Sequence, residues 1–500
     1  MKFFLQLICC AIILSFSRTN LYCTVPKKFE YSEASAQAYQ SIFDLRLKEA
    51  TTQINHLKKI EPDNLIPIFL ENYIDFFKIF INENENEFRS LSANKDVRLN
   101  KLRQGDTNSP YYRYCQAELH FQWALARLKF EENYTAFNEI SKAYALLTEN
   151  QKRFPEFVAN NKTLGLIHAV IGTIPDKFKW GVKLVSGMSG SIAQGRNEIE
   201  AVLQYAQYND FPFEQETVIM YAFLLLHLNN KSDAAWSVLQ NNKKLNPKTS
   251  ALSCFVLSNV AAHSGRNDEA IKILSQKPVG TQYHPFYFLD YQLGLYKLYR
   301  LDADADKYLS VYTQKFRGKN YIKEAYQKLG WFALINNRPA SYKQNMACVT
   351  LYGTVIIEGD KNALAEAKKK ETPNVTLLKA RLLFDGGYFS KAYLLLKSIS
   401  VQQFTNKAEQ LEYLYRMGRI AHQLKYGQEA KTNYLQTIEK GEKETSYFAC
   451  NAALQLGLLM EEQGDKKQAV AYYKRCLSMN PSEYADGLHQ KAKAGINRLK

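Results

Sequence analysis

The residue types that most often carry out catalysis are scattered along this 500-residue chain. No HExxH, Walker-type phosphate loop or GxSxG pattern occurs, and no two carboxylates form a recognisable general acid–base motif. His227, His263 and His422 are far apart in sequence and lack neighbouring residues that would make a site. We therefore predict that the protein is not an enzyme and has no cofactor or metal ion.

A glycine-containing segment, Gly165 to Gly195, is the one place where chemistry could be hidden. Glycine-rich loops can bind phosphate, but no GxGxxG follows a strand here and no Lys-Ser/Thr follows the glycines. We interpret the glycines as allowing two helices to cross closely, with Trp180 filling the seam between the amino-terminal part and the following repeats. An enzyme built on this segment is the least favoured alternative.

The elements that must position any site are helical hairpins, and Cys450 to Pro481 shows their pattern most clearly. Apolar residues recur at intervals of three and four, strand signals are nearly absent, and small residues stand where two helices would touch. Counting Cys450 as position one, the characteristic residues are Leu456 and Gly457 at seven and eight, Ala469 at twenty, Tyr473 at twenty-four and Pro481 at thirty-two. This pattern resembles the tetratricopeptide repeat superfamily, whose repeats are about 34 residues long.

The same pattern recurs along the chain, so one hairpin can bury its apolar face against the next. The small residue of the second helix recurs at Ala235, Ala270, Ala392, Ala430 and Ala469. Leu293-Gly294 and Leu329-Gly330 indicate two further hairpins whose second helices lack a clear alanine. The resemblance implies an all-α fold, a TPR-like α-solenoid in which helical hairpins form a right-handed superhelix, with a non-repeat, glycine-containing insert.

The repeat pattern also suggests boundaries. We expect a signal peptide (1–17), an irregular helical amino-terminal lobe (18–160), the glycine-containing insert (161–210), central repeats (211–352), carboxyl-terminal repeats (373–482) and a capping helix (483–500). A hinge is expected at 353–373, where the repeat pattern is interrupted.

The first residues read as an export signal. Lys2 precedes a short apolar run and Ser15-Phe16-Ser17 resembles a cleavage site. We predict a chain secreted across the inner membrane, periplasmic or associated with the outer membrane. Asn20-Leu21-Tyr22 is a poor lipidation signal, and the sequence leaves open whether Cys23 carries a lipid. It likewise leaves open a disulfide between Cys450 and Cys476.

The formal net charge is +16. This excess favours an acidic protein or peptide partner or an anionic membrane surface. The basic residues are spread over helix exteriors, and with an export signal we do not expect nucleic acid as a partner.

The inner wall of a tetratricopeptide superhelix is formed by fixed positions of each first helix. At those positions the clearest repeats carry aromatic, basic and amide side chains, as a groove for an extended peptide or a partner helix would. The predicted partner-binding residues are Arg381, Phe384, Tyr415, Arg419, His422 and Asn451. We expect a non-enzymatic scaffold in envelope assembly or maintenance.

A second resemblance is to the tetratricopeptide repeat protein 39 family, which includes the fungal inclusion body clearance protein. It rests on Gly172-Thr173-Ile174-Pro175, the stretch through Trp180 and Leu184, and the glycines at 187, 190 and 195. It implies an alternative function as an envelope adaptor in lipid homeostasis. Phe178, Trp180 and Leu184 would then contact a membrane or an acyl chain. Members of that family lack an export signal, so their intracellular role is not carried over.

Overall fold

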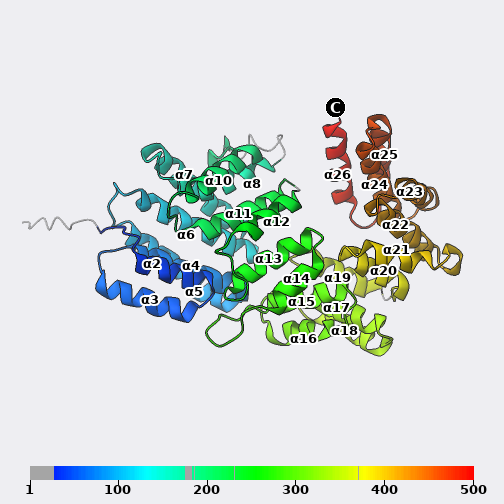
Figure 1. The fold of residues 1–500 in the computed structure, drawn as a ribbon, viewed down its shortest axis with the longest axis horizontal. Helices are drawn as coiled ribbons and strands as arrows, with labels where there is room; N and C mark the ends of the chain where they lie inside the picture. Colours follow the sequence, from blue (N-terminus) through cyan, green and yellow to red (C-terminus); the bar gives the residue numbers. More distant parts are fainter. Residues whose placement is uncertain (1–26, 175–182, 185, 230, 370, 500) are drawn as a thin grey trace, which may run out of the picture.

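Helical hairpins follow one another along an arc in the computed structural model (Figure 1). The structure describes residues 27–174, 183–184, 186–229, 231–369 and 371–499. Within those ranges the chain is helical apart from turns and two isolated bridges, Lys27 with Gly105 and Lys28 with Asn64. The all-α fold of stacked hairpins is thus confirmed. The predicted signal peptide, Cys23, Phe178 and Trp180 lie outside the described residues.

The helices have the following bounds. In chain order they are α2 (Glu33–Phe43), α3 (Leu47–Ile60), α4 (Ile66–Asn82), α5 (Glu85–Leu102), α6 (Pro110–Lys129), α7 (Asn133–Arg153), α8 (Asn160–Gly172), α10 (Ile192–Ala206), α11 (Glu214–His227), α12 (Ser232–Asn241), α13 (Ala251–His263), α14 (Asn267–Ser275), α15 (Phe288–Tyr299), α16 (Ala305–Lys315), α17 (Ile322–Ile335), α18 (Pro339–Leu351), α19 (Glu358–Lys369), α20 (Val375–Asp385), α21 (Phe389–Lys397), the 3₁₀ turn η1 (Val401–Gln403), α22 (Lys407–Gln423), α23 (Gly427–Gly441), α24 (Phe448–Glu462), α25 (Lys466–Ser478) and α26 (Ala485–Arg498).

Among the described residues, eight hairpins share one turn geometry. The first helix ends at a residue of left-handed backbone conformation, and the next residue donates its N–H to the carbonyl five residues earlier, as Asp465 does to Met460 at 2.9 Å. This is the bond of a Schellman motif. The left-handed residues are Leu45, Glu131, Gly265, Leu301, Asn337, Gly387, Lys425 and Gly464. Only three of these eight residues are glycines, so the positions of glycines in the sequence do not reveal the other five turns.

Five residues after most of these turns stands a fully buried alanine. The six alanines are Ala50, Ala136, Ala270, Ala392, Ala430 and Ala469, each with 0% exposure. In the two last complete repeats the first helix carries a glycine opposite a buried tyrosine. A Cβ on Gly457 would lie 2.5 Å from the Tyr473 ring, and one on Gly418 would lie 2.7 Å from Tyr434. Small and large residues therefore alternate across the helix contact and set the spacing within a hairpin.

The amino-terminal helices pack back onto the central repeats. The His284 N–H donates to the Leu45 carbonyl at 2.8 Å, and the Asn320 N–H and side-chain amide donate to the Glu83 carboxylate at 3.0 and 2.8 Å. One hydrophobic core accordingly runs from Ala38 to Leu329, whereas the carboxyl-terminal hairpins have separate smaller cores. The protein thus has a thick amino-terminal part and a slender carboxyl-terminal arm (Figure 1).

A buried ion cluster ties α6, α8 and α11 together inside the thick part. The Lys162 ammonium lies 2.8 Å from Glu118 and 3.0 Å from Glu216, and the Lys162 and Glu118 side chains are both fully buried. The hydroxyls of Tyr39 and Tyr73 each donate to Glu216 at 3.0 Å. Five helices, α2, α4, α6, α8 and α11, therefore contribute to one polar network within an apolar core.

The insert region is a helical hairpin with an unusually close crossing. A Cβ on Gly195 in α10 would lie 2.1 Å from the Gly165 carbonyl oxygen of α8, and one on Gly172 would lie 2.4 Å from the Ile192 nitrogen. The glycines thus allow α8 and α10 to pack backbone against backbone, as interpreted from the sequence. Trp180, expected to fill the seam, is outside the described residues.

The segment expected to be a hinge contains a helix, α19, that the sequence pattern did not predict. Asp360 accepts hydrogen bonds from the N–H groups of Tyr321 and Glu324 at 2.7 and 2.9 Å, at the first turn of α17. Glu366, further along α19, accepts a hydrogen bond from the Trp331 indole N–H at 2.7 Å. These bonds hold α19 against α17, so most of this segment is part of the stack.

A second buried cluster should make stability sensitive to acid. Glu139 in α7 contacts Lys95 and His120, each at 2.5 Å. Burial alone would raise the pKa of Glu139, but hydrogen bonds from His120 and Lys95 outweigh it and lower the pKa from 4.5 to about 2. Because the folded-state pKa is depressed, this stabilisation is present above about pH 4.5 and is lost as the pH falls towards 2.

We expect the denaturant midpoint of the wild type to fall more steeply between pH 5 and pH 2.5 than that of Glu139→Gln. Both midpoints should be followed by circular dichroism, with Glu429→Gln, a change at an exposed ion pair, as the control. Parallel pH profiles for the wild type and Glu139→Gln would contradict the assignment.

Candidate functional site

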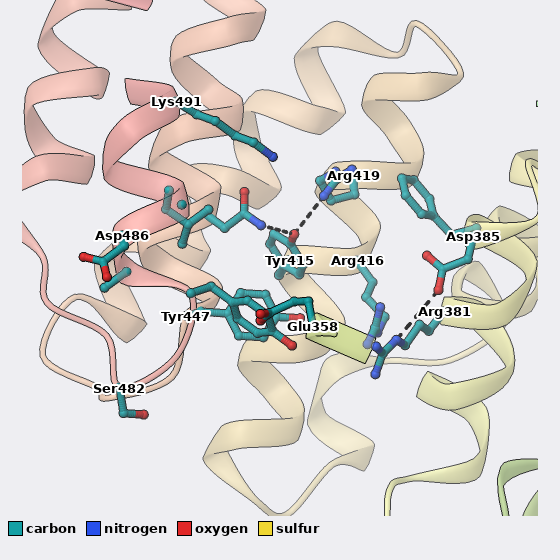
Figure 2. Close-up of a pocket in the computed structure, with 16 residues that line it drawn as sticks. Glu358, Arg381, Asp385, Tyr415, Arg416, Arg419, Tyr447, Ser482, Asp486 and Lys491 are labelled. Carbon is teal, nitrogen blue, oxygen red and sulfur yellow. Dashed lines mark hydrogen bonds and ion pairs between the residues drawn. The ribbon is translucent and has the colours of Figure 1, made fainter. Parts of the chain in front are cut away.

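A half-open groove of about 780 Å³ lies on the carboxyl-terminal arm (Figure 2). Its walls come from the first helices of successive hairpins, α20, α22 and α24, from the start of α19, and from α26 with the loop before it. The lining residues are Glu358, Arg381, Phe384, Asp385, Tyr415, Arg416, Arg419, Tyr447, Asn451, Ser482, Tyr484, Ala485, Asp486, Gly487, Leu488 and Lys491. The structure therefore brings together five of the six predicted partner-binding residues.

Each of the two predicted arginines rests on an aromatic ring of the preceding repeat. The Arg381 guanidinium lies 4.6 Å from the ring centroid of Trp331 in α17, and the Arg419 guanidinium lies 4.9 Å from that of Phe384 in α20. At these distances the ring face attracts the cation and limits its motion. Asn451 in α24 continues the series, because its amide donates to the Tyr415 hydroxyl of α22 at 2.7 Å.

Arg419 is held in place without being neutralised. Its terminal nitrogen donates to the Tyr415 hydroxyl at 2.9 Å, and among the described residues no carboxylate forms an ion pair with it. Its Nε is buried without an acceptor in the described part of the chain. Arg381 is paired only loosely, at 3.8 Å from Asp385, and 37% of its side chain is exposed. Both cations are available to an anionic ligand.

The other charged side chains that line the groove are of both signs. Arg416 is already neutralised, because Glu412, one turn earlier on α22, accepts its Nε–H at 2.7 Å. Asp385 lies beside Arg381, Asp486 and Ser482 lie on the far side of the groove, and Glu358 lies between them (Figure 2). Arg419, which has no ion-pair partner among the described residues, lies on the α20–α22 side of the groove.

His422, the sixth predicted residue, does not line this groove. It is 5% exposed, and its Nδ1 lies 3.3 Å from the Tyr434 hydroxyl within its own hairpin. Burial lowers the pKa of His422. Its Nε2 lies 3.5 Å from Glu462 in the first helix of the next repeat, so the imidazole packs among helices and does not line this groove.

Sequence reasoning missed Arg416, Tyr447, Tyr484 and Lys491. The last two lie on or beside α26, which folds back against α24 and α25 (Figure 1). The loop before α26 adds Ser482 and Tyr484 to the lining of the groove. Tyr484 packs edge-on against Tyr447 with ring centroids 5.0 Å apart. No local pattern signals this return of the chain, since it depends on contacts between separate repeats.

The residues proposed for lipid contact are only partly described. Leu184 is 77% exposed, whereas Phe178 and Trp180 lie outside the described residues. Over the part of the chain that the structure covers, none of the helices combines the length and apolar character needed to cross a membrane. The described residues also hold no group of three or more His, Cys, Asp or Glu side chains that could bind a metal ion.

Cys450 and Cys476 face each other across the last hairpin, as expected. Their sulfur atoms are 3.6 Å apart, both side chains are buried, and neither is in a disulfide.

Comparison with known proteins identifies the repeat type. Residues 451–483 match the family model described as tetratricopeptide repeat, which confirms the repeat predicted at Cys450 to Pro481. The narrower resemblance to the tetratricopeptide repeat protein 39 family stays a prediction. No curated protein matches the chain.

Two solved structures illustrate the more distant likeness. The structure of Naa15/Naa10 bound to HypK-THB shows 14% identity and a TM-score of 0.25, and the match covers 93% of this chain and 66% of that chain. The crystal structure of the APC/C hetero-tetramer Cut9-Hcn1 shows 12% identity and a TM-score of 0.26, covering 94% and 100% respectively. Scores this low carry no conclusion about function.

Proposed function

We propose that this chain, an all-α stack of hairpins that carries a tetratricopeptide repeat at residues 451–483, is a non-enzymatic scaffold that binds an acidic protein segment in its carboxyl-terminal groove. The observation that carries the proposal is Arg419. A guanidinium fixed between Phe384 and Tyr415, with no ion-pair partner in the described chain, is preorganised for an external carboxylate.

The surroundings of Arg419 support a peptide over a small ion. The groove has an aromatic wall of Phe384, Tyr415, Tyr447 and Tyr484, and aromatic and arginine side chains are the residues enriched at protein interfaces. The net charge of +16 favours encounter with an acidic partner. Export and a role in envelope assembly or maintenance belong to the proposal and rest on the amino-terminal sequence alone.

We expect Arg381→Glu combined with Arg419→Glu to weaken capture of the main partner at least about tenfold, because each change places a like charge opposite the acidic segment. Proximity labelling of the exported protein would identify the partner, and its affinity would then be measured with purified proteins. Arg89→Glu with Arg475→Glu is the matched control, since both side chains are exposed and outside the groove. Unchanged affinity in the groove variant, at unchanged helicity, would reject this surface.

A lipid-linked adaptor is the second candidate function. It is favoured by exposed apolar side chains around the insert, where Val170 is 50% and Leu184 is 77% exposed. Co-sedimentation with anionic liposomes, compared between the wild type and Trp180→Ala, discriminates between the two functions.

A further inference from the structure

The contacts that hold the ligand-facing side chains of the groove in place repeat from hairpin to hairpin. In each case a side chain of one first helix rests on an aromatic side chain of the first helix before it. The three contacts, which we term rungs, are Arg381 on Trp331, Arg419 on Phe384 and Asn451 on Tyr415. The first two rungs are cationic and the third is a neutral amide. A ligand lying along the arm therefore meets two cations in succession and then an uncharged hydrogen-bonding group.

The separation of the two cationic rungs is set by helix packing. Arg381 lies on α20 and Arg419 on α22, which are successive first helices in contact. Packed helices have their axes about 8–10 Å apart. Two carboxylates that engage both arginines must therefore project from the same side of the ligand at about this distance.

Different backbone conformations meet this requirement at different residue spacings. A polyproline II segment has three residues per turn and rises about 3.1 Å per residue, so residues three apart face the same way about 9 Å apart. In a β-strand the nearest residues on one face are two apart and only about 6.6 Å distant. In an α-helix, residues seven apart are separated by about 10.5 Å on one face.

The character of the groove favours the polyproline II form. A docked helix lays an apolar stripe into a hydrophobic groove, but four basic and three acidic side chains line this one. Aromatic-lined grooves are the surfaces that receive polyproline II segments, and here Phe384, Tyr415, Tyr447 and Tyr484 supply the rings.

We propose that the groove selects an extended, polyproline II-like segment carrying two acidic residues three positions apart. The inference rests on the proposed function and adds the register of the ligand to it. One carboxylate pairs with Arg381, displacing its loose contact with Asp385, and the other pairs with Arg419. The residue beyond the Arg419 rung faces Asn451 and is uncharged.

Synthetic peptides test this register. A series with two glutamates in a neutral Pro- and Ser-containing background, of identical composition but with the glutamates two, three, four or seven positions apart, would be titrated into the full-length protein. We expect the spacing of three to bind at least about tenfold more tightly than the spacings of two and four, because only there do both ion pairs form.

Conservative variants of the two arginines test which peptide carboxylate pairs with which arginine. Arg419→Gln and Arg381→Gln should each abolish the spacing preference, whereas Arg419→Lys should keep part of it because the charge remains. One peptide glutamate is expected to pair with Arg419. Replacing it by glutamine should weaken binding to the wild type but cause little further loss of affinity in Arg419→Gln, as a double-mutant cycle gives for two groups in direct contact.

The outcomes separate this inference from the proposed function. Equal binding of all spacings, or tightest binding at seven, would overturn the polyproline II register while leaving an acid-binding groove. Failure of every acidic peptide, together with undiminished capture of the natural partner by Arg381→Glu/Arg419→Glu, would overturn both.

Discussion

Replacing Lys162 by methionine is expected to destabilise the amino-terminal part of the protein by about 3–5 kcal/mol. The substitution keeps most of the length of the side chain but removes the ammonium that pairs with Glu118 and Glu216, for which no other cationic partner lies among the described residues. Glu118 is fully buried, so its charge would be left without compensation in a medium of low polarity.

The protonation states in this cluster explain the size of the effect. Burial by itself would lower the pKa of Lys162, but Glu118 and Glu216 outweigh it and raise the pKa. Burial raises the pKa of Glu118 and the nearby Glu216 carboxylate raises it further, whereas the Lys162 ammonium opposes both effects. The Lys162 ammonium also lies 5.6 Å from the ring centroid of Phe213, and that cation–π contact is lost as well.

The measurement should show which helices lose stability in Lys162→Met as well as how much stability is lost, because a stack of repeats need not unfold in one step. We expect faster amide hydrogen exchange in α6, α8 and α11 and a lower denaturant midpoint. Lys397→Met, at an ion pair whose lysine side chain is 57% exposed, should cost less than about 1 kcal/mol. Adding Glu118→Gln to Lys162→Met should recover part of the loss. A midpoint equal to that of Lys397→Met would refute a stabilising role for the cluster.

Replacing Gly195 by alanine is expected to cost about 3 kcal/mol, the upper end of the range for overpacking. The new Cβ would lie 2.1 Å from the Gly165 carbonyl oxygen and 2.7 Å from the Ala169 nitrogen. Both are backbone atoms of α8, so no side chain can turn aside and the two helices must separate. The gain in helix propensity, about 1 kcal/mol, is smaller than this penalty.

Gly487→Ala is the matched control, because Gly487 is also within a helix and a Cβ there meets nothing within 4 Å. It should be neutral or stabilise by up to about 1 kcal/mol. The two variants should be compared by thermal denaturation and by exchange of the α8 and α10 amides. Equal stability of both variants would show that the close crossing is not needed.

The helical hairpins could be predicted because their signals are local. A buried alanine such as Ala392 or Ala469, and a glycine opposite a tyrosine such as Gly457, reflect contacts inside one hairpin. The hairpins whose turns are closed by Leu301 and Asn337 gave weaker signals, because their second helices lack the clear alanine and a left-handed residue other than glycine has no distinct sequence mark.

The candidate site was predicted in part for the same reason. Arg381, Phe384, Tyr415, Arg419 and Asn451 were found by their positions in the repeat, which place them on first helices. His422 was assigned to the groove by the same rule, yet it packs against Tyr434 inside the hairpin.

By itself, the sequence determined the all-α hairpins, the repeat at residues 451–483 and the small residues that bring paired helices together, since neighbours along the chain satisfy these patterns. Only the tertiary structure decided which charges are compensated. Arg416 is neutralised by Glu412, whereas Arg419 has no ion-pair partner among the described residues. Lys162 meets Glu118 and Glu216 from other helices, and α26 returns to line the groove. These features depend on contacts between distant segments, and repeat spacing does not specify them.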